Sequence, residues 1–445
     1  MNGCKMKYKI REQNELKPSG LHWIDYLPKD WEKASLKYIL NYIIGSTPST
    51  SKDKYFFGNN IWVSISDIKD KYISDAKQRL SDEAIIDCNI KKVPKGSLLY
   101  SFKLSVGQMS FNTVDLYTNE AIASFLDNEN VNLDFWYYAL GRYLIEYSNE
   151  NIYGAKLLNQ DLIKNARLLV PSKIEQQKIA NFLDEKSKIF DEAISKKEQL
   201  ISKLELAKQS LISEVVTGKL KVVEQNSKLQ TIKREKKELK LSGVEWLGDI
   251  PKDWQVKKSK YLFEIRKRIA GTLDFDVLSI TQKGIKIKDI ETGGGQLSMD
   301  YSKYQIVNIG DFAMNHMDLL TGFVDIAKVQ GVTSPDYRVF SLIDKNSDSN
   351  FYLYLFQMGY KNQIFFAFGQ GSSQLGRWRF PTEEFNKFYF PYPSLEEQQK
   401  ISKYLDEKLI HFDNTIEKTK QTIKKLKEAK EALISQAVTG KIEVL

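Results

Sequence analysis

Cysteine and long apolar runs are both scarce in this sequence of 445 residues. Cysteine occurs only at Cys4 and Cys88, too few for the disulfide framework of a small secreted domain. No apolar run approaches the ~20 residues that a membrane helix needs. The N-terminus is basic, but no apolar segment follows it as in a secretory signal. We therefore expect a cytoplasmic protein without disulfides or membrane contact.

Residue patterns that support catalysis are also missing. The three histidines, His22, His316 and His411, are scattered and lack the spacing of metal ligands. The sequence has no G-x-x-x-x-G-K-[ST] phosphate-binding loop, and "AFGQG" at 367–371 has no adenine-methylating "NPP" motif behind it. No Ser–His–Asp arrangement is supported. These absences disfavour an enzyme, so we expect no catalytic residue, no metal site and no cofactor on this chain.

The charge balance is positive. Lysine and arginine number 66 against 57 aspartate and glutamate residues, which gives a formal net charge of +9 and a pI of about 9.0. A positive excess favours a polyanionic partner such as nucleic acid. An AT-rich coding bias also raises the lysine content, so charge alone does not decide the partner.

The clearest feature of the chain is an internal repeat. "SGLHWIDYLPKDW" begins at Ser19 and returns as "SGVEWLGDIPKDW" at Ser242. "PSKIEQQKIANFLDEK" begins at Pro171 and returns as "PSLEEQQKISKYLDEK" at Pro393. "LISEVVTGKL" and "LISQAVTGKI" follow at the same offset as this second pair. The chain is therefore a tandem duplication, and each half has a short preamble, a long middle region and a long helix.

The two middle regions predict related domains. "KGSLLYSFKLSVGQM" from Lys95 corresponds to "IGDFAMNHMDLLTGF" from Ile309, and "NEAIASF" from Asn119 corresponds to "SPDYRVF" from Ser334. Such short apolar runs enter and leave Gly-containing turns, as strands do. An aromatic run of helical character follows in each region, "DFWYYALGRYLIEY" or "NFYLYLFQMGYKNQIFFAF". We expect two mixed α/β domains of ~135–140 residues with one fold and different surfaces.

Each half ends in a long amphipathic helix. No proline or glycine occurs between Glu175 and Val216, where apolar residues recur every three, four or seven positions. Thr217-Gly218 and Thr439-Gly440 end the two helices, because glycine commonly terminates a helix. At 1.5 Å per residue each helix is about 60 Å long. A narrow apolar stripe needs a partner, so we predict an antiparallel coiled-coil pair that separates the two domains with pseudo-twofold symmetry.

These patterns divide the chain into six segments. The charged stretch "KVVEQNSKLQTIKREKKELK" at 221–240 has no apolar periodicity and is interpreted as a solvated linker. The predicted segments are an N-terminal preamble (1–31), a first domain (32–170), a first helix (171–220), a linker with the second preamble (221–254), a second domain (255–392) and a second helix (393–445).

Together these motifs resemble one family. The two "W…PKDW" preambles, the two "P-S-x-x-E-Q-Q-K-I" helix starts and the two "VTGK" helix ends are similar to those of the specificity (S) subunit of type I restriction–modification systems. The resemblance covers essentially the whole chain after about Glu15. It implies that each middle region is a target-recognition domain for one half of a split, asymmetric DNA site. It also implies that the helices set the gap between the halves and that the chain does no chemistry itself.

The resemblance further implies the partners. They are double-stranded DNA, two methyltransferase (M) subunits and restriction (R) subunits, in a complex that acts against foreign DNA. S-adenosylmethionine, ATP and Mg²⁺ are expected on those partner subunits. Contact with the M subunits is expected at the helix ends, at Leu211, Thr217, Gly218, Leu433, Thr439 and Gly440.

Candidate DNA-contacting residues lie in three polar segments of each middle region. Base recognition needs donors and acceptors on loops of a rigid scaffold, with lysine or arginine beside them for phosphate. The segments are 45–55, 101–108 and 151–156 in the first region, and 281–288, 315–322 and 369–379 in the second. The last, "GQGSSQLGRWR", is the strongest, because arginine pairs with guanine and glutamine with adenine. The predicted DNA-binding residues are Ser46, Thr47, Lys52, Lys54, Lys103, Gln108, Lys156, Gln282, Lys283, Asn315, His316, Ser372, Ser373, Gln374, Arg377 and Arg379.

Two other functions stay open at this point. A structural coiled-coil scaffold with two protein-binding modules explains the helices, but it does not explain the basic charge or the polar glycine-containing loops. A fused enzyme that methylates or cuts DNA is disfavoured by the missing motifs. DNA binding that weakens steeply with salt distinguishes the DNA-recognition subunit from the scaffold.

Overall fold

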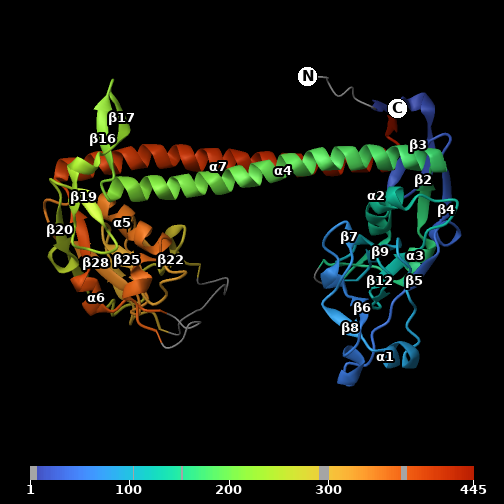
Figure 1. Cartoon of the computed structure of the whole chain (residues 1–445), viewed down its shortest axis with the longest axis horizontal. Coiled ribbons are helices and arrows are strands. Elements are labelled where there is room, and N and C mark those ends of the chain that lie inside the picture. The colour runs from blue at the N-terminus through green and yellow to red at the C-terminus, as the bar shows by residue number, and fades with distance from the viewer. Residues whose placement is uncertain (1–7, 104, 152–153, 290–299, 372–377) are drawn as a thin grey trace. The chain divides into compact units, whose positions relative to one another are not determined.

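The chain forms two units, and each contains one α/β domain (Figure 1). The computed structural model describes residues 8–103, 105–151, 154–289, 300–371 and 378–445. The first unit comprises Met1–Lys197 with Gln421–Leu445, and the second comprises Glu198–Lys420. Two helices of 44 residues, α4 (Lys173–Val216) and α7 (Leu395–Val438), each contribute one part to each unit. Both halves of the repeated sequence therefore build each unit, and the two predicted mixed α/β domains are confirmed.

The first domain is built on two sheets. A five-stranded sheet has the order β5-β12-β9-β10-β7, and a three-stranded sheet has the order β11-β6-β8. In the larger sheet β7 pairs with β10 in parallel, and the other neighbours are antiparallel. The strands are β5 (Tyr42–Ile44), β6 (Asn60–Val63), β7 (Tyr72–Ile73), β8 (Gln78–Leu80), β9 (Leu98–Ser101), β10 (Met109–Asn112), β11 (Tyr117–Thr118) and β12 (Ile122–Phe125).

Among its described residues the first unit also contains shorter strand pairs and three short α-helices. The pairs are β2–β3, β4–β15, β13–β14 and β1–β30, all antiparallel. Their bounds are β1 (Tyr8–Ile10), β2 (Leu16–Leu21), β3 (Ile24–Pro28), β4 (Glu32–Ser35), β13 (Asn149–Glu150), β14 (Lys156–Leu157), β15 (Arg167–Val170) and β30 (Ile442–Val444). The helices are α1 (Asp82–Asp87), α2 (Leu133–Tyr143) and α3 (Gln160–Asn165).

Helix α2 carries much of the first core. Its N-terminus is capped by the Asn132 side chain, which accepts a hydrogen bond from the backbone N–H of Phe135. Phe135 and Trp136 are fully buried, and they share one hydrophobic cluster with Ile179 and Leu183 of α4. Burial of side chains of this size stabilises the fold by about 1.5–3 kcal/mol each. The aromatic run therefore joins the domain to the start of its helix.

The second domain is built on a four-stranded antiparallel sheet with an aromatic core. The order is β21-β28-β25-β26, with bounds β21 (Phe263–Arg266), β25 (Phe312–Met314), β26 (Val324–Ile326) and β28 (Arg338–Leu342). The ring of Phe263 lies 5.6 Å from that of Phe312, 5.4 Å from Phe340 and 5.3 Å from Phe356. Phe356 belongs to α5 (Ser349–Lys361), which Asp348 caps by accepting from Phe351 N–H. Edge-to-face rings thus join this sheet to α5.

Among its described residues the second unit also contains five strand pairs and one short α-helix. They are β16 (Leu220–Gln225), β17 (Lys228–Lys233), β18 (Leu239–Leu241), β19 (Asp249–Pro251), β20 (Gln255–Lys258), β22 (Leu278–Thr281), β23 (Gly284–Ile287), β24 (Gln305–Val307), β27 (Gly331–Thr333), β29 (Tyr389–Tyr392) and α6 (Thr382–Lys387). The pairs are β16–β17, β18–β19, β20–β29, β22–β23 and β24–β27, all antiparallel.

In the first unit α4 and α7 lie antiparallel, as predicted. Ile179, near the start of α4, shares a hydrophobic cluster with Val438 at the end of α7. Further along α4, Asp191 forms an ion pair of 2.7 Å with Lys430, which lies earlier in α7. An exposed ion pair contributes at most about 1 kcal/mol, so the apolar stripe supplies most of the stability of the pair.

The second unit repeats this arrangement with the other ends of the helices. Val216, the last residue of α4, shares a cluster with Leu405 of α7. Lys208, earlier in α4, forms an ion pair of 2.6 Å with Asp413, later in α7. The helices therefore run antiparallel here too.

The preamble tryptophans hold the helix ends. Trp31 donates from Nε1 to the Glu175 carboxylate at the start of α4 (2.8 Å). Gly440, just after α7, adopts φ +70°, and a Cβ built on it would lie 2.4 Å from the Pro28 side chain. The "PKDW" of the first half therefore packs against the "VTGK" of the second half.

The second preamble makes the matching contacts. Trp254 donates from Nε1 to the Glu397 carboxylate at the start of α7 (2.8 Å). Gly218, just after α4, adopts φ +76°, and a Cβ there would lie 2.5 Å from the Pro251 side chain. Only glycine adopts this backbone conformation freely and also leaves room for the proline, which explains why both "TG" pairs occur at these points.

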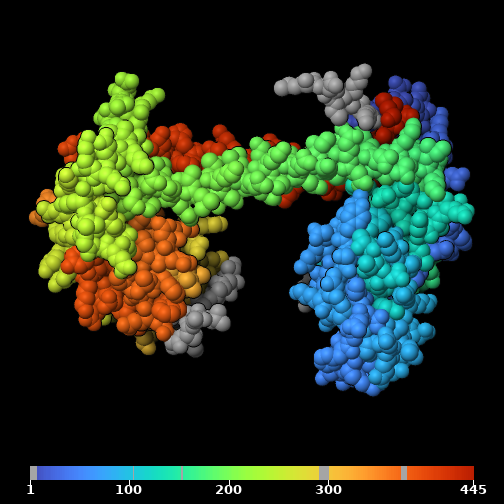
Figure 2. All heavy atoms as spheres, viewed as in Figure 1, coloured from blue at the N-terminus to red at the C-terminus, as the bar shows by residue number. Residues whose placement is uncertain are grey.

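The segment interpreted as a solvated linker is instead a β-hairpin, so that prediction is wrong. β16 and β17 pair along their full length, and Asn226 and Ser227 at the turn both adopt left-handed φ angles, as type I′ hairpin turns require. Val222 is buried, and Figure 2 shows the hairpin standing out from the surface of the second unit. In the first unit β1 and β30 form the corresponding strand pair.

Candidate nucleic-acid interface

Two of the predicted segments in the first unit meet at one backbone hydrogen bond. Leu158 N–H donates to the carbonyl of Phe102 (3.1 Å), which joins the end of segment 151–156 to segment 101–108. Phe102 N–H in turn donates to the carbonyl of Ala121 (3.0 Å) at the start of β12. β13 and β14 form a small hairpin beside this junction. Two loops that are distant in sequence are thus joined to each other at one point of the central sheet.

The third segment of the first unit reaches the same place through Glu120. The Thr47 hydroxyl donates to the Glu120 carboxylate. This hydrogen bond, with a smaller effect from the charge of Lys103, lowers the pKa of Glu120. Segments 45–55 and 101–108 therefore lie at the same side of the domain.

The second unit brings its own segments together in the same way. Phe380 N–H donates to the carbonyl of His316 (2.8 Å), and Leu319 N–H donates to the carbonyl of Trp378 (3.0 Å). These bonds join the end of segment 369–379 to segment 315–322. Phe380 follows Leu158 at the offset that separates the two helix starts, so the junction is the same one that the first unit uses.

The remaining segment of the second unit is also attached here. Gln282, in the turn between β22 and β23, donates from its side-chain amide to the carbonyl of Thr321 (3.4 Å). Gln370 and Arg379 exchange two backbone hydrogen bonds of 2.8 and 2.9 Å at the base of their loop. In each unit the structure thus connects part of each predicted segment to the other two.

Most of the described candidate residues present their side chains to solvent, as DNA contact requires. Ser46 and Asn315 are half-buried, and His316 is buried. Ser372, Ser373, Gln374 and Arg377 lie outside the described residues. The exposed candidates are Thr47, Lys52, Lys54, Lys103, Gln108, Lys156, Gln282, Lys283 and Arg379.

Lys52 and Lys54 belong to a separate cluster in the first unit. Lys52 donates from Nζ to the Tyr55 hydroxyl (2.8 Å), and Lys54 pairs with Glu83. Tyr55 is buried in a small hydrophobic cluster with Trp62. The structure does not connect these two lysines to the junction of the other segments.

His316 is buried where a base-contacting side chain would be exposed. It is 6% exposed, and burial, followed by the charges of Arg338 and Arg379, lowers its pKa to about 3. The side chain is therefore neutral at neutral pH, and it is not presented on the surface. In the first domain the corresponding residue is Phe102, which is also buried.

Arg338 stabilises the end of segment 369–379 in the second unit, and the sequence analysis missed this residue. It is 3% exposed, donates from Nη2 to the carbonyl of Phe380 (2.8 Å) and lies 4.6 Å from the centre of the Phe385 ring. Burial lowers its pKa to about 10. The repeat places Ala123 at this position in the first domain, so an arginine at a core position of the repeat was the available signal.

Two kinds of site do not occur in the described residues. No group of three or more His, Cys, Asp or Glu side chains there could hold a metal ion. No helix in the described ranges combines the length and apolarity needed to span a bilayer.

Comparison with known proteins identifies the family. The model of the type I restriction modification DNA specificity domain matches twice, at residues 28–206 and 251–428. The chain belongs to this family. The two matches cover most of the sequence and correspond to the two halves of the duplication, so the family resemblance of the motifs is confirmed.

Curated relatives and a solved structure agree with this assignment. The type I restriction enzyme MjaVIII specificity subunit of Methanocaldococcus jannaschii is 24% identical over 98% of this chain and 97% of that protein. The MjaIX specificity subunit of the same organism is 28% identical over 43% of this chain, and this match spans 44% of the relative. A structure described as the basis of complex assembly and conformational transition of the type I R-M system matches 93% of this chain and 99% of that chain, with 14% identity and a TM-score of 0.66. It supports the fold.

The residues predicted to contact M subunits have structural roles at the helix ends. The Thr217 and Thr439 hydroxyls donate to the carbonyls of Ser213 and Ser435, both at 2.6 Å. Both threonines are buried. Leu211 and Leu433 pack against the two hydrophobic clusters, and Gly218 and Gly440 contact the preamble prolines. Their contact with an M subunit stays a prediction.

Proposed function

We propose that this chain is the DNA specificity subunit of a type I restriction–modification complex and that each unit recognises one half of a split site. The observation that carries this proposal is the double match to the DNA specificity family, together with two loop segments that the same backbone junction joins in each unit and a third attached by a side-chain hydrogen bond. The chain supplies recognition, and partner subunits carry out the chemistry.

The two halves of the site differ because the two units present different side chains. The first unit exposes Lys103 and Gln108 at its junction, and the second exposes Gln282 and Arg379. Glutamine suits adenine and arginine suits guanine in the major groove, whereas lysine suits guanine or phosphate. Because the two domains share a fold but differ in their loops, the DNA target is asymmetric.

The gap between the half-sites is set by α4 and α7. Each helix has 44 residues without interruption, and each contributes to both units. A continuous helix has a fixed rise of about 1.5 Å per residue, so its length limits which base pairs the two domains reach. The bases between the half-sites are not recognised.

The partners of the complex follow from the same assignment. Two M subunits bind this chain and use S-adenosylmethionine to methylate adenine, and R subunits add an ATP- and Mg²⁺-dependent motor and nuclease. The ends of the long helices are buried against the preambles. The preambles would then present the surface that an M subunit contacts. The positive net charge of +9 favours binding of duplex DNA.

The test is a genome-wide map of adenine methylation. The chain is co-expressed with its neighbouring M subunit in a host without methylation. We expect one split motif with two unlike halves and a fixed gap. A stable complex of the two proteins without any methylated motif would contradict the proposal, and DNA binding at increasing salt would then test the scaffold alternative.

A further inference from the structure

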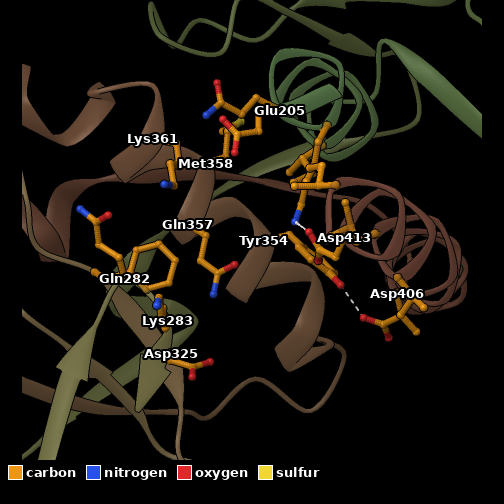
Figure 3. A pocket seen from close by; sticks show the side chains of 18 of the residues that line it. Glu205, Gln282, Lys283, Asp325, Tyr354, Gln357, Met358, Lys361, Asp406 and Asp413 are labelled. Atoms are coloured by element: carbon orange, nitrogen blue, oxygen red, sulfur yellow. Dashed lines mark hydrogen bonds and ion pairs between the residues drawn. The ribbon is translucent and has the colours of Figure 1, made fainter. Parts of the chain in front are cut away.

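A groove of about 770 Å³ lies in the second unit between α5 and the helix pair (Figure 3). Its walls come from α4, α5, α7 and the start of β23. Ile410, on its rim, is 60% exposed. Charged, aromatic and apolar side chains line it, among them Glu205, Asp325, Tyr354, Met358, Asp406 and Ile410.

A tyrosine–aspartate pair lies at one side of this groove. The Tyr354 hydroxyl donates to the Asp406 carboxylate, as the dashed line in Figure 3 marks. The first unit has the same pair, in which the Tyr138 hydroxyl donates to Asp184 (2.6 Å). Asp184 and Asp406 both belong to the repeated "LDEK" motif, and each tyrosine lies at the same distance after the cap of its helix. The two pairs are therefore equivalent positions of the repeat.

In the first unit a lysine of the same chain occupies this position. Lys71 donates from Nζ to Asp184 (2.6 Å), and its ammonium lies 5.1 Å from the ring centre of Tyr137 and 5.6 Å from that of Tyr138. The backbone holds it in place, because Phe111 N–H donates to the Lys71 carbonyl (2.8 Å) where β7 joins β10. The site thus binds a cation by an ion pair and by aromatic faces.

The second unit has no strand that corresponds to β7 among its described residues. Its main sheet ends at β26, whereas the first continues to a fifth strand. The outer edge of β26 is capped, because Gln357 donates to the Val324 carbonyl and Ile326 N–H donates to the Asp325 side chain. An added strand is therefore not expected, and a side chain is the better occupant.

Asp406 has no cationic partner among the described residues of its own unit. Among the residues that the structure describes, no lysine or arginine forms an ion pair with it, and it is exposed. Lys208, the lysine of α4 on this groove, is already paired with Asp413. Figure 3 shows Lys283 and Lys361 on the opposite side of Tyr354 from Asp406.

We propose that this groove receives a lysine or arginine side chain from a partner protein subunit, in the position that Lys71 fills in the first unit. Four lysines and four carboxylates line the groove, so its net charge does not select the occupant. The occupant is a protein side chain rather than DNA, because the equivalent Tyr138 and Asp184 hold the ammonium of Lys71. Asp406, which has no cationic partner in the described part of the chain, also repels phosphate. The exposed Ile410 also favours an apolar neighbour. The identity of the partner as a subunit of the complex rests on the proposed function.

A peptide probe tests the cation site without any partner. The probe is acetyl-KDKYIS-amide, the sequence of residues 69–74, added to the full chain with labelled isoleucine methyl groups. We expect the methyl signals of Ile410 and Ile416, which line the groove, to shift. Asp406→Asn should abolish the shift. Glu407→Gln, an exposed acidic neighbour outside this groove, should retain it.

A second peptide controls for the charge. Replacing the lysine at the position of Lys71 with methionine keeps the length of the side chain and removes its cation. We expect no shift with this peptide. Equal shifts with both peptides, or with wild type and Asp406→Asn, would overturn the proposal, as would no shift in wild type.

Binding to purified partner subunits then tests the occupant. We expect Asp406→Asn to weaken the affinity for the M or the R subunit about tenfold and Glu407→Gln to leave it unchanged. Unchanged affinity of Asp406→Asn for both subunits would overturn the assignment to a partner of the complex. Failure of the wild-type chain to bind either subunit would contradict the proposed function instead, and the peptide result would still decide whether the groove binds a cation.

Discussion

At the scale of single residues, buried polar groups distinguish the second domain from the first. His316 and Arg338 occupy positions where the first domain has Phe102 and Ala123. Arg338 donates to the carbonyl of Phe380, the residue that follows segment 369–379. The segment with the most promising donors is therefore supported by a buried cation, which the first domain does not use.

The buried His316 predicts a loss of stability in acid. Its folded-state pKa is lowered from 6.5 to about 3, so below pH ~6.5 the unfolded chain binds a proton that the folded chain does not. The free energy of unfolding should fall by about 2 kcal/mol between pH 6.5 and 5 from this group. In His316→Phe this part of the fall should be absent, as measured by denaturant unfolding at each pH.

A matched control separates this effect from general acid sensitivity. His411 is exposed on α7, so His411→Asn should follow the wild-type pH profile. An identical profile for His316→Phe and wild type would contradict the buried position of His316.

The glycines after the helices predict a graded loss of stability. Gly218 and Gly243 have similar φ angles, +76° and +73°, but only a Cβ at Gly218 would contact the Pro251 side chain, at 2.5 Å. Gly243→Ala should cost about 1–2 kcal/mol from backbone strain alone. Gly218→Ala should cost ~1–3 kcal/mol more from overpacking. Thermal unfolding measures both, and equal losses would contradict the packing of the helix end on the preamble.

At the scale of elements, the long helices could be predicted and the hairpin could not. Uninterrupted spacing from Glu175 to Val216 predicted a helix, and the structure has Lys173–Val216. The 221–240 stretch was misinterpreted because charge dominates its composition, while its pairing depends on two left-handed residues, Asn226 and Ser227. The sequence signal for the strands was a pair of turn residues between two short runs in which apolar and polar residues alternate weakly.

The meeting of the loop segments also exceeded what the sequence could predict. Composition identified segments such as 101–108 and 369–379 one at a time. Their junctions depend on single backbone hydrogen bonds over long sequence distances, such as Leu158 to Phe102 and Phe380 to His316. Backbone groups occur in every residue, so no side-chain pattern marks these bonds. The repeat offset that relates the two donors was the only trace in the sequence.

The helix pair predicts a gap that follows helix length. Seven residues inserted after Lys197 in α4 and seven inserted in α7 after Lys424, which the antiparallel ion pairs place opposite, add about 10 Å to each helix. At 3.4 Å per base pair the unrecognised gap should grow by about three base pairs. The methylation map of the double insertion measures this change.

The single insertion is the control for register. Seven residues in α4 alone shift its ion pairs past α7, and we expect methylation to fall sharply. A double insertion that leaves the gap unchanged would exclude the helices as its determinant.

At the scale of the whole molecule, duplication explains the organisation. Each half supplies a domain, and each unit is completed by a helix end from the other half, as the contacts of Gly218 and Gly440 with Pro251 and Pro28 show. The repeated contacts keep the scaffold the same in both units, while the loops of the two domains differ. One chain can therefore carry two recognition surfaces of unlike specificity on a common scaffold.

Paired loop variants test this account most directly. One variant carries Lys103→Ala and Gln108→Ala, the other Gln282→Ala and Arg379→Ala, and all four side chains are exposed. Each variant is expressed with the M subunit, and adenine methylation is mapped. We expect the first to relax one half of the split motif and the second to relax the other, because each lost base contact removes about 1–3 kcal/mol of discrimination. Relaxation of both halves by either variant, or of neither half by both, would contradict the assignment of one half-site to each unit.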